Sequence, residues 1–278
     1  MDKNYVEFDL GKFYFSHRFN IYNKKDVLSK HIHDCYEIIF IKKGNFEYHF
    51  EDSIINVSGG DLLITPPHIY HYFVARDESS CERYILLVKD EEFKSLINVK
   101  EPCKVNVFER EQIFSCYKRF DYYTGEKVGD AIKGNINLLV EMLIKELILN
   151  VAEIKEFDNE SLYFSNPILS SIVRYINDNL INITFTSDLM DKFNISESYL
   201  NKLFQKNLKI TPKRYLVLKK MSLAKKLIGE KLPLGEVATQ CGFASYTAFY
   251  RTFVEHYKVS PNKMLDWVLI WVKNNVKI

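Results

Sequence analysis

The fold of the C-terminal part is decided by residues 237–253, which read VATQCGFASYTAFYRTF. A short helix is expected to begin near Gly235 and to end at a sharp turn around Gly242, because glycine tolerates a positive φ. Ser245 is a suitable N-cap for a second helix, since its side-chain oxygen can accept from the backbone N–H groups of the first turn. This order of elements predicts a helix-turn-helix unit.

The same pattern occurs earlier, in residues 189–204, which read LMDKFNISESYLNKLF. Asn194 takes the place of Gly242, and Ser196 takes the place of Ser245. One helical hairpin is a weak signal, but two copies about 49 residues apart are far more specific. The second helix of each copy should bury an apolar stripe and expose polar or cationic groups to DNA. The predicted inward stripe comprises Tyr199, Leu203 and Phe204 in the first copy, and Phe249 and Phe253 in the second.

A basic helix is expected to join the two copies. Thr211 is its predicted N-cap, Pro212 suits its first position, and Gly229 ends it. A rigid rod of this kind would hold the two units one DNA turn, ~34 Å, apart on one face of the duplex. A helical bundle whose basic face binds no DNA is the alternative.

Charge is divided unevenly along the chain, although the net charge is only +2. Residues 165–278 carry 17 basic and eight acidic residues, whereas residues 1–164 carry 21 basic and 28 acidic ones. A basic segment joined to an acidic one suggests that only the second meets a polyanion. The alternative is that the basic excess consists of solvated lysines on a domain that binds no polyanion.

Residues 167–264 resemble the DNA-binding domain of the AraC/XylS family of bacterial transcription regulators. The resemblance is carried by residues 189–204 and 235–261. It implies seven helices, two of which read adjacent major grooves of double-stranded promoter DNA, and it implies RNA polymerase as a partner. By position, the base-facing residues of the family correspond to Ser198, Asn201, Lys202, Tyr246, Thr247 and Arg251.

Two departures from the family pattern are visible. The family usually has glycine after each recognition helix, where this chain has Lys209 and Lys258. We expect this to lower the stability of both helix ends. Lys202 stands where arginine is frequent in the family. A lysine lacks the planar guanidinium that can donate two parallel hydrogen bonds to guanine.

The N-terminal part, to about Asp90, has the pattern of closely spaced antiparallel strands. Residues 36–41 and 46–50 read as strands around a turn at residues 42–45, and Gly59 and Gly60 mark another turn before residues 62–64. Short strands between glycine, asparagine and aspartate turns predict a sandwich or barrel.

Within these strands, two segments resemble the two cupin motifs. The first has His31, His33, Glu37 and Gly44, and the second has Gly60, Pro66 and His71, with His68 where a glycine is usual. In metal cupins the matching His31, His33, Glu37 and His71 would bind a divalent metal, and such a donor set suits iron, manganese, nickel or zinc. AraC-type sensor domains often keep a similar histidine-bearing stretch without metal chemistry. We therefore expect these four residues to contact a small-molecule effector, a carbohydrate being one candidate, with no metal and no cofactor.

The aromatic residues of this region suit a pocket lined by rings and an ordinary barrel core equally well. They are Tyr36, Phe40, Phe46, Tyr48, Tyr70, Tyr72 and Phe73.

Between the two parts, an apolar residue recurs every three or four positions over residues 136–151, which predicts an amphipathic helix. Its stripe is buried within its own domain or forms a dimer seam, and the family resemblance favours a homodimer. The predicted domains are residues 1–152 for effector binding and dimerisation, a linker over residues 153–166, and residues 167–278 for DNA binding. The predicted fold is therefore α+β with two domains: a cupin-like β-barrel plus helices, then an all-α domain with two helix-turn-helix units.

Several classes of protein are disfavoured. Five scattered cysteines without a CxxC pair argue against a disulfide framework or a zinc ribbon. The first ten residues lack the apolar core of a signal peptide, and apolar runs such as residues 267–272 are too short to span a bilayer. We therefore expect a cytoplasmic, ligand-responsive transcription regulator, more often an activator, that is not an enzyme and binds no membrane. Two alternatives are a metal-dependent cupin enzyme fused to a DNA-binding tail, and a protein whose helical domain docks another protein.

Overall fold

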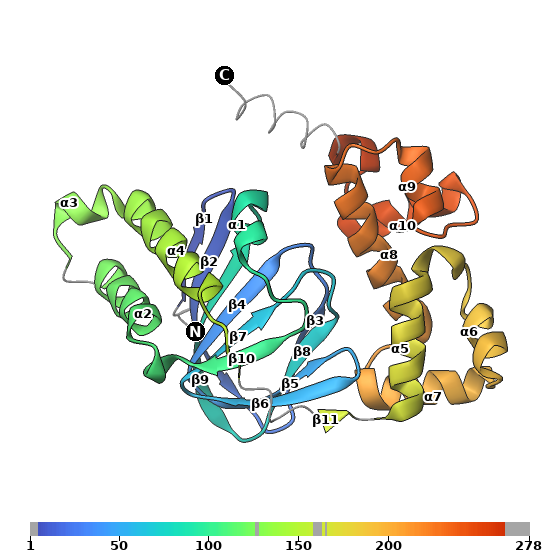
Figure 1. Ribbon diagram of the computed structural model, residues 1–278, viewed down its shortest axis with the longest axis horizontal. Coiled ribbons are helices and arrows are strands. Elements are labelled where there is room, and N and C mark those ends of the chain that lie inside the picture. The colour runs from blue at the N-terminus through green and yellow to red at the C-terminus, as the bar shows by residue number, and fades with distance from the viewer. Residues whose placement is uncertain (1–4, 126–127, 158–162, 165, 265–278) are drawn as a thin grey trace. The chain divides into compact units, whose positions relative to one another are not determined.

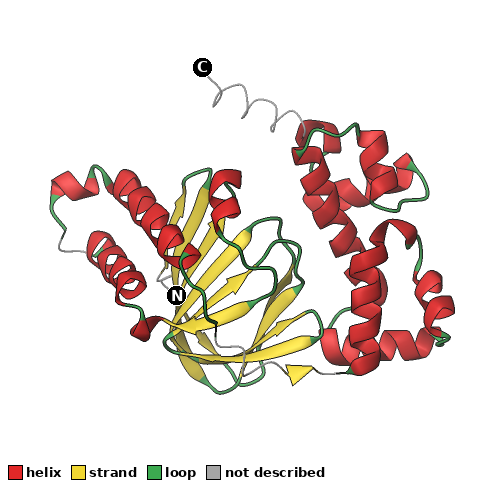
Figure 2. Cartoon of the chain, viewed as in Figure 1, coloured by secondary structure: helices red, strands yellow, loops and turns green. Residues whose placement is uncertain are grey.

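In the computed structural model, the chain forms two compact units, residues 1–163 and 164–278. The structure describes residues 5–125, 128–157, 163–164 and 166–264, so the apolar run at residues 267–272 lies outside the described residues. The elements are drawn in Figure 1 and coloured by type in Figure 2, which separates a unit rich in strands from a unit made of helices. The predicted α+β fold is confirmed.

The first unit contains two sheets, and all pairings among β1–β10 are antiparallel. One sheet has the strand order β1-β2-β9-β4-β7-β10, and the other has β11-β6-β5-β8-β3. The strands are β1 (Tyr5–Asp9), β2 (Phe13–Tyr22), β3 (Val27–His31), β4 (Tyr36–Lys43), β5 (Asn45–Phe50), β6 (Ser53–Ser58), β7 (Asp61–Thr65), β8 (His71–Ala75), β9 (Ser79–Val88), β10 (Cys103–Asn106) and β11 (Tyr163–Phe164).

Strand β4 shows how the first unit is layered. Because side chains alternate along a strand, Ile38 and Phe40 point to one face and Ile39 and Ile41 to the other. The first pair joins a core between the sheet and the helices, and the second pair joins a core between the two sheets. The helices of this unit are α1 (Glu91–Leu96), α2 (Glu111–Thr124), α3 (Asp130–Lys133) and α4 (Ile136–Ala152), with a short η1 (Val107–Glu109).

Helix α4 confirms the amphipathic helix predicted over residues 136–151. Its stripe from Val140 to Val151 is buried in the core that α2 and the first sheet share. Figure 1 shows α2 and α4 packed along the same sheet. Burial within the unit therefore accounts for this stripe.

The second unit confirms the duplicated pattern. Its elements are α5 (Pro167–Asn179), η2 (Leu180–Asn182), α6 (Thr186–Phe193), α7 (Glu197–Leu208), α8 (Pro212–Gly229), α9 (Leu234–Gln240) and α10 (Tyr246–Tyr257). A further helix begins at Pro261 and is described as far as Met264. The pairs α6–α7 and α9–α10 are the two helix-turn-helix units, and α8 joins them as predicted, with Thr211 as its N-cap.

Both turns contain the left-handed residue that the sequence indicates, with φ of 48° at Asn194 and 66° at Gly242. The second turn also has no room for a side chain. A Cβ built on Gly242 would come within 2.6 Å of the Ile181 carbonyl oxygen and 2.8 Å of the Leu180 carbonyl oxygen, both in η2. Gly242 is therefore required by close packing as well as by its φ angle.

A buried lysine also contacts the turn at Gly242. Lys220, in α8, is only 4% exposed, and its Nζ donates to the Gly242 carbonyl oxygen at 2.6 Å. The ammonium also lies 5.0 Å from the centre of the Phe243 ring. Lys219 is buried as well, so the joining helix is less of a basic surface than its sequence indicates.

The five cysteines are free and buried, as expected of small core residues. The sequence predicts strands only to about Asp90, but β10 follows later in the chain and forms an edge of the first sheet. The predicted linker contains the two-residue strand β11 in its described part. Among the described residues, no helix is long and apolar enough to cross a membrane.

The buried ammonium of Lys220 predicts a pH dependence of stability. Burial lowers the pKa of Lys220 from 10.5 to about 8. Between these pH values the unfolded chain binds more protons than the folded chain, so this lysine makes the free energy of unfolding rise with pH. We expect this contribution, up to about 3 kcal/mol between pH 8 and 10.5, to appear in denaturant titrations as the difference in pH dependence between the unmodified chain and Lys220→Met. The comparison is needed because the neighbouring Cys241 thiol, whose pKa burial raises to about 12, contributes with the opposite sign. Lys213→Met, an exposed control on the same helix, should retain the contribution of Lys220; equal slopes in both variants would contradict the assignment.

A second prediction concerns the end of α10. Lys258 has φ of 60°, a left-handed conformation that is unfavourable for any residue with a Cβ. Lys258→Gly should therefore raise the free energy of unfolding by about 1 kcal/mol. Lys258→Ala keeps the Cβ and should give no such gain, which separates the backbone effect from loss of the charge. Chemical denaturation of the three proteins at one pH measures the difference.

Candidate DNA-binding face and effector site

The first recognition helix, α7, turns an apolar stripe inward. Ser196 caps it, accepting from the Tyr199 backbone N–H at 3.2 Å, so the helix begins where the sequence predicts. Its buried residues are Leu200, Leu203, Phe204 and Leu208. The predicted base-facing residues Ser198 and Lys202 are exposed, and Asn201 is half-buried.

The prediction that Tyr199 belongs to the inward stripe is wrong, because its side chain is 39% exposed. Leu200 takes the inward position and is 1% exposed. Successive residues on a helix differ by about 100° in direction, so a shift of one position moves the stripe from Tyr199 to Leu200. Tyr199 therefore lies beside the outward face.

The second recognition helix, α10, matches the prediction more closely. Phe249 and Phe253 are fully buried, while Thr247 and Arg251 are exposed and Tyr246 is 41% exposed. Ser245 caps the helix, accepting from the Ala248 backbone N–H. The outward face of α10 therefore presents a phenol, a hydroxyl and a guanidinium, groups that can donate to base edges or phosphates.

Exposed cations surround both recognition helices. A polyanion attracts such a surface, and the attraction does not depend on base sequence. The exposed basic residues of α7, α8, α10 and their ends are Lys202, Lys206, Lys209, Lys213, Arg214, Lys226, Arg251 and Lys258.

In the first unit, the structure brings the four predicted effector residues together. Their ligand atoms lie within 4.8 Å of one another. His31 ends β3 and is the cross-strand partner of His71 at the start of β8, while His33 lies in the loop that leads to Glu37 in β4. Glu37 is 5% exposed and His71 is fully buried. The histidines and the carboxylate thus form one cluster at one end of the two sheets, buried at Glu37 and His71 and half-buried at His31 and His33.

Glu37 is the centre of this cluster. Its Oε2 lies 3.0 Å from Nε2 of His71 and 3.5 Å from Nε2 of His33. Burial alone would raise the pKa of Glu37, but the two imidazoles outweigh it and hold the pKa well below its usual value. Burial likewise lowers the pKa of His33, but the Cys35 carbonyl and the Glu37 carboxylate raise it to about 10. In this form the cluster holds an ion pair.

The aromatic residues near the cluster do not all line one pocket. Phe46, Tyr48 and Phe73 lie in the core between the two sheets. Phe40 lies in the opposite core against the helices, and Tyr36 packs against that core too. The alternation of side chains along β4 explains the split.

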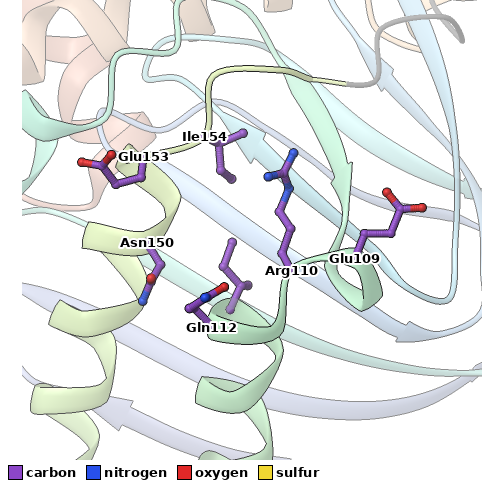
Figure 3. A pocket seen from close by; sticks show the side chains of 7 residues that line it. Glu109, Arg110, Gln112, Asn150, Glu153 and Ile154 are labelled. Carbon is purple, nitrogen blue, oxygen red and sulfur yellow. The ribbon is translucent and has the colours of Figure 1, made fainter.

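A pocket of about 310 Å³ that the sequence does not indicate lies between the start of α2 and the end of α4. Figure 3 shows polar side chains of both helices around it, including Gln112 and Asn150, together with Arg110 just before α2. It contains none of the four predicted effector residues, and its lining does not indicate a ligand.

Comparison with known proteins identifies both units. Residues 13–110 match the model of the AraC-like ligand binding domain, and residues 189–266 match that of a helix-turn-helix domain. The chain is 25% identical to the probable transcriptional regulator LumQ of Photobacterium leiognathi, over 84% of this chain and 90% of that protein.

Two further relatives are regulators of bacterial operons. The Msm operon regulatory protein of Streptococcus mutans is 26% identical over 84% of each chain. The lactose operon transcription activator of Staphylococcus xylosus is 26% identical over 49% of this chain and 50% of its own. With an AraC-like ligand-binding domain followed by a DNA-binding domain of two helix-turn-helix units, the chain belongs to the AraC family of transcription regulators.

Proposed function

We propose that this regulator activates transcription in the cytoplasm, by binding paired promoter sites with both recognition helices and assisting RNA polymerase. The observation that carries the proposal is the pair of capped recognition helices, α7 and α10, whose inward faces are buried and whose outward faces are polar and cationic. Two such helices on one scaffold fit recognition of successive major grooves.

The residues proposed to face the bases are Ser198, Asn201, Lys202, Tyr246, Thr247 and Arg251. Arg251 is the strongest candidate for specific readout, because a guanidinium can donate two parallel hydrogen bonds to guanine. Lys202 and the other exposed lysines suit phosphate contacts, which position the protein without reading sequence.

The effector is proposed to be a small polar molecule such as a carbohydrate, bound at the cluster of His31, His33, Glu37 and His71. Hydroxyl groups of a sugar can donate to the carboxylate and accept from imidazole N–H groups. The name of the lactose operon activator among the relatives supports this class. Because the relatives are transcription regulators, we infer that the cluster serves sensing and that the protein is not an enzyme.

A second face of α4 is proposed to form the homodimer. Leu138, Met142 and Leu149 are 59%, 59% and 53% exposed, although the other side of the helix is buried in the core. Their spacing of four and seven residues places them in one line along the helix, as in a coiled-coil seam. Lys145 falls in the same line by this spacing, and its ammonium lies 2.7 Å from the Glu141 carboxylate, so the proposed seam would contain one ion pair between its apolar residues.

Arg251→Ala tests whether Arg251 contacts base edges and contributes to sequence preference. A duplex selected by the full-length protein from a random-sequence library serves as the probe. The substitution should weaken binding to this duplex by ~1–3 kcal/mol and relax preference at one or two base pairs, because it removes one base contact. Fluorescence anisotropy at fixed salt concentration measures both effects.

The matched control is Arg174→Ala, which removes an exposed arginine of α5 outside the recognition helices. It should leave the base preference unchanged. If Arg251→Ala retains both the affinity and the preference of the unmodified protein, Arg251 does not read bases.

Met142→Glu tests the dimer. A carboxylate in this line would have to be desolvated on pairing, a cost that an ion pair with the nearby Lys145 does not fully offset, so we expect sedimentation velocity to show a monomer at concentrations where the unmodified chain is a dimer. Asn137→Glu, which is exposed on the same helix outside the line, should remain dimeric. A monomeric unmodified chain, or a dimeric Met142→Glu variant, would reject this face.

A further inference from the structure

We propose that the DNA-binding unit contains a small-molecule site of its own, a pocket that takes an amphipathic monocarboxylate, a ligand with an apolar body and one carboxylate group. All residues that line the pocket belong to the unit of residues 164–278, and none belongs to the proposed effector cluster. The proposal goes beyond the proposed function, which assigns no ligand other than DNA to this unit.

The pocket lies where the two helix-turn-helix units meet the helix that joins them. Its volume is about 430 Å³, and small-molecule sites usually enclose roughly 300–1,000 Å³. One wall is the start of α6, and another is the turn at Gly242 with the adjoining side of α10. The third wall is a face of α8 made of Lys213, Leu216, Val217 and Lys220, which are three, four and seven residues apart along the helix. A ligand here would therefore contact both helix-turn-helix units and the joining helix.

The lining of this pocket is mainly apolar and includes two aromatic rings. Phe185, just before α6, is 62% exposed, and Phe243, just after the turn, is half-buried. An apolar ligand body would remove part of this ring surface from water, which is favourable. The rings and the aliphatic side chains of α8 therefore account for the apolar part of the ligand.

Lys220 accounts for the charged part. Its side chain lines the pocket but is only 4% exposed. An ammonium can donate three hydrogen bonds, whereas in the described part of the chain Nζ of Lys220 has one acceptor, the Gly242 carbonyl oxygen, and no ion pair. Burial of a cation without an anionic partner is costly. A carboxylate in the pocket would accept from the remaining N–H groups and supply the missing charge.

The other charges near the pocket do not take that place. Asp188 interacts with Lys220 only electrostatically. Its Oδ2 accepts instead from the backbone N–H groups of Thr184 and Phe185, at 2.7 and 3.0 Å. The described residues that line the pocket include Lys213 as a second cation and no acidic side chain. The charges therefore favour an anionic ligand over a neutral or cationic one.

The small number of buried donors selects the class of anion. A phosphate or sulfate group has more oxygens and more charge to desolvate than one ammonium and an otherwise apolar wall can compensate. A carboxylate carries a single charge on two oxygens, which matches the two N–H groups of Lys220 that remain. Burial lowers the pKa of Lys220 to about 8, so the ammonium is mostly charged at pH 7.

The experiment is a calorimetric titration of the full-length chain at pH 7 with 4-phenylbutanoate and, separately, with 4-phenylbutanamide, its uncharged counterpart. We expect one carboxylate per chain, bound at least about 10-fold more tightly than the amide, because the hydrogen bond to a buried ammonium is charge-assisted. Lys220→Met keeps an apolar side chain of similar length and should bind both compounds equally weakly. Lys219→Met is the matched control, because Lys219 is buried in the same helix but does not line the pocket. It should retain the preference for the carboxylate.

Because Lys220 also contacts Gly242, the exposed Phe185 provides a second test. Phe185→Ala should weaken both compounds by a similar factor, about 5-fold, and retain the preference for the carboxylate, since it removes apolar contact and no charge. Ile168→Ala, at an exposed residue of α5 outside the pocket, should bind both compounds as the unmodified chain does. Circular dichroism checks that each variant folds.

Three results would overturn the proposal: no binding of 4-phenylbutanoate to the unmodified chain, equal affinities for the acid and the amide, or full affinity for both compounds in Phe185→Ala. A preference for the carboxylate that Lys220→Met retains would also overturn it, because the anion would then bind elsewhere, for example at the histidines of the first unit.

Discussion

The DNA-binding unit depends on one close contact around Gly242. The glycine lies against two carbonyl oxygens of η2, while its own carbonyl accepts from the buried ammonium of Lys220 in α8. The junction therefore joins the segment before the first helix-turn-helix, the joining helix and the turn of the second. Because a backbone carbonyl and a desolvated cation meet in a dry environment, this hydrogen bond is stronger than one at the surface. Movement of the turn would break the contact, so the placement of α10 depends on it.

Helix α8 extends this constraint over the whole unit. Near its start, Tyr215 packs its ring against Phe204 of α7, with centres 5.5 Å apart. Toward its end, Met221 and Ile228 join the core of the second helix-turn-helix with Phe249 and Phe253. Eighteen residues of helix span about 27 Å. One continuous helix thus carries a hydrophobic core near each end, and each core supports one recognition helix. Such an arrangement limits the spacings of paired DNA sites that both helices can occupy together.

The two helix-turn-helix units were predictable because the residues that decide their turns are adjacent in the sequence. A residue that tolerates positive φ between two helical segments, followed by a serine that caps the second, marks each turn without knowledge of the fold. What could not be predicted depends on tertiary packing. The sequence does not tell whether Tyr199 or Leu200 faces inward, because both fit a helical period and only the neighbouring helices decide. It does not show that Lys220 is buried, since a lysine in a basic helix is ordinarily solvated. The four residues of the cluster were predicted from the resemblance to the cupin motifs, but the contacts of His33 and His71 with backbone carbonyls were not.

Strand β4 gives a physical route between the ligand cluster and the rest of its unit. Its residues alternate, so that Glu37 belongs to the cluster on one face while Ile38 and Phe40 belong to the core shared with the helices on the other. The ring of Phe40 lies 4.6 Å from that of Tyr117 in α2, and α2 packs on α4. Since a close-packed core transmits small displacements, a ligand bound at the proposed effector site that shifted Glu37 would also change the packing beneath α4. The outer face of α4 carries the proposed dimer seam. A ligand can alter DNA affinity only if it binds two arrangements of the protein differently, and a change in how two copies pair would supply such arrangements.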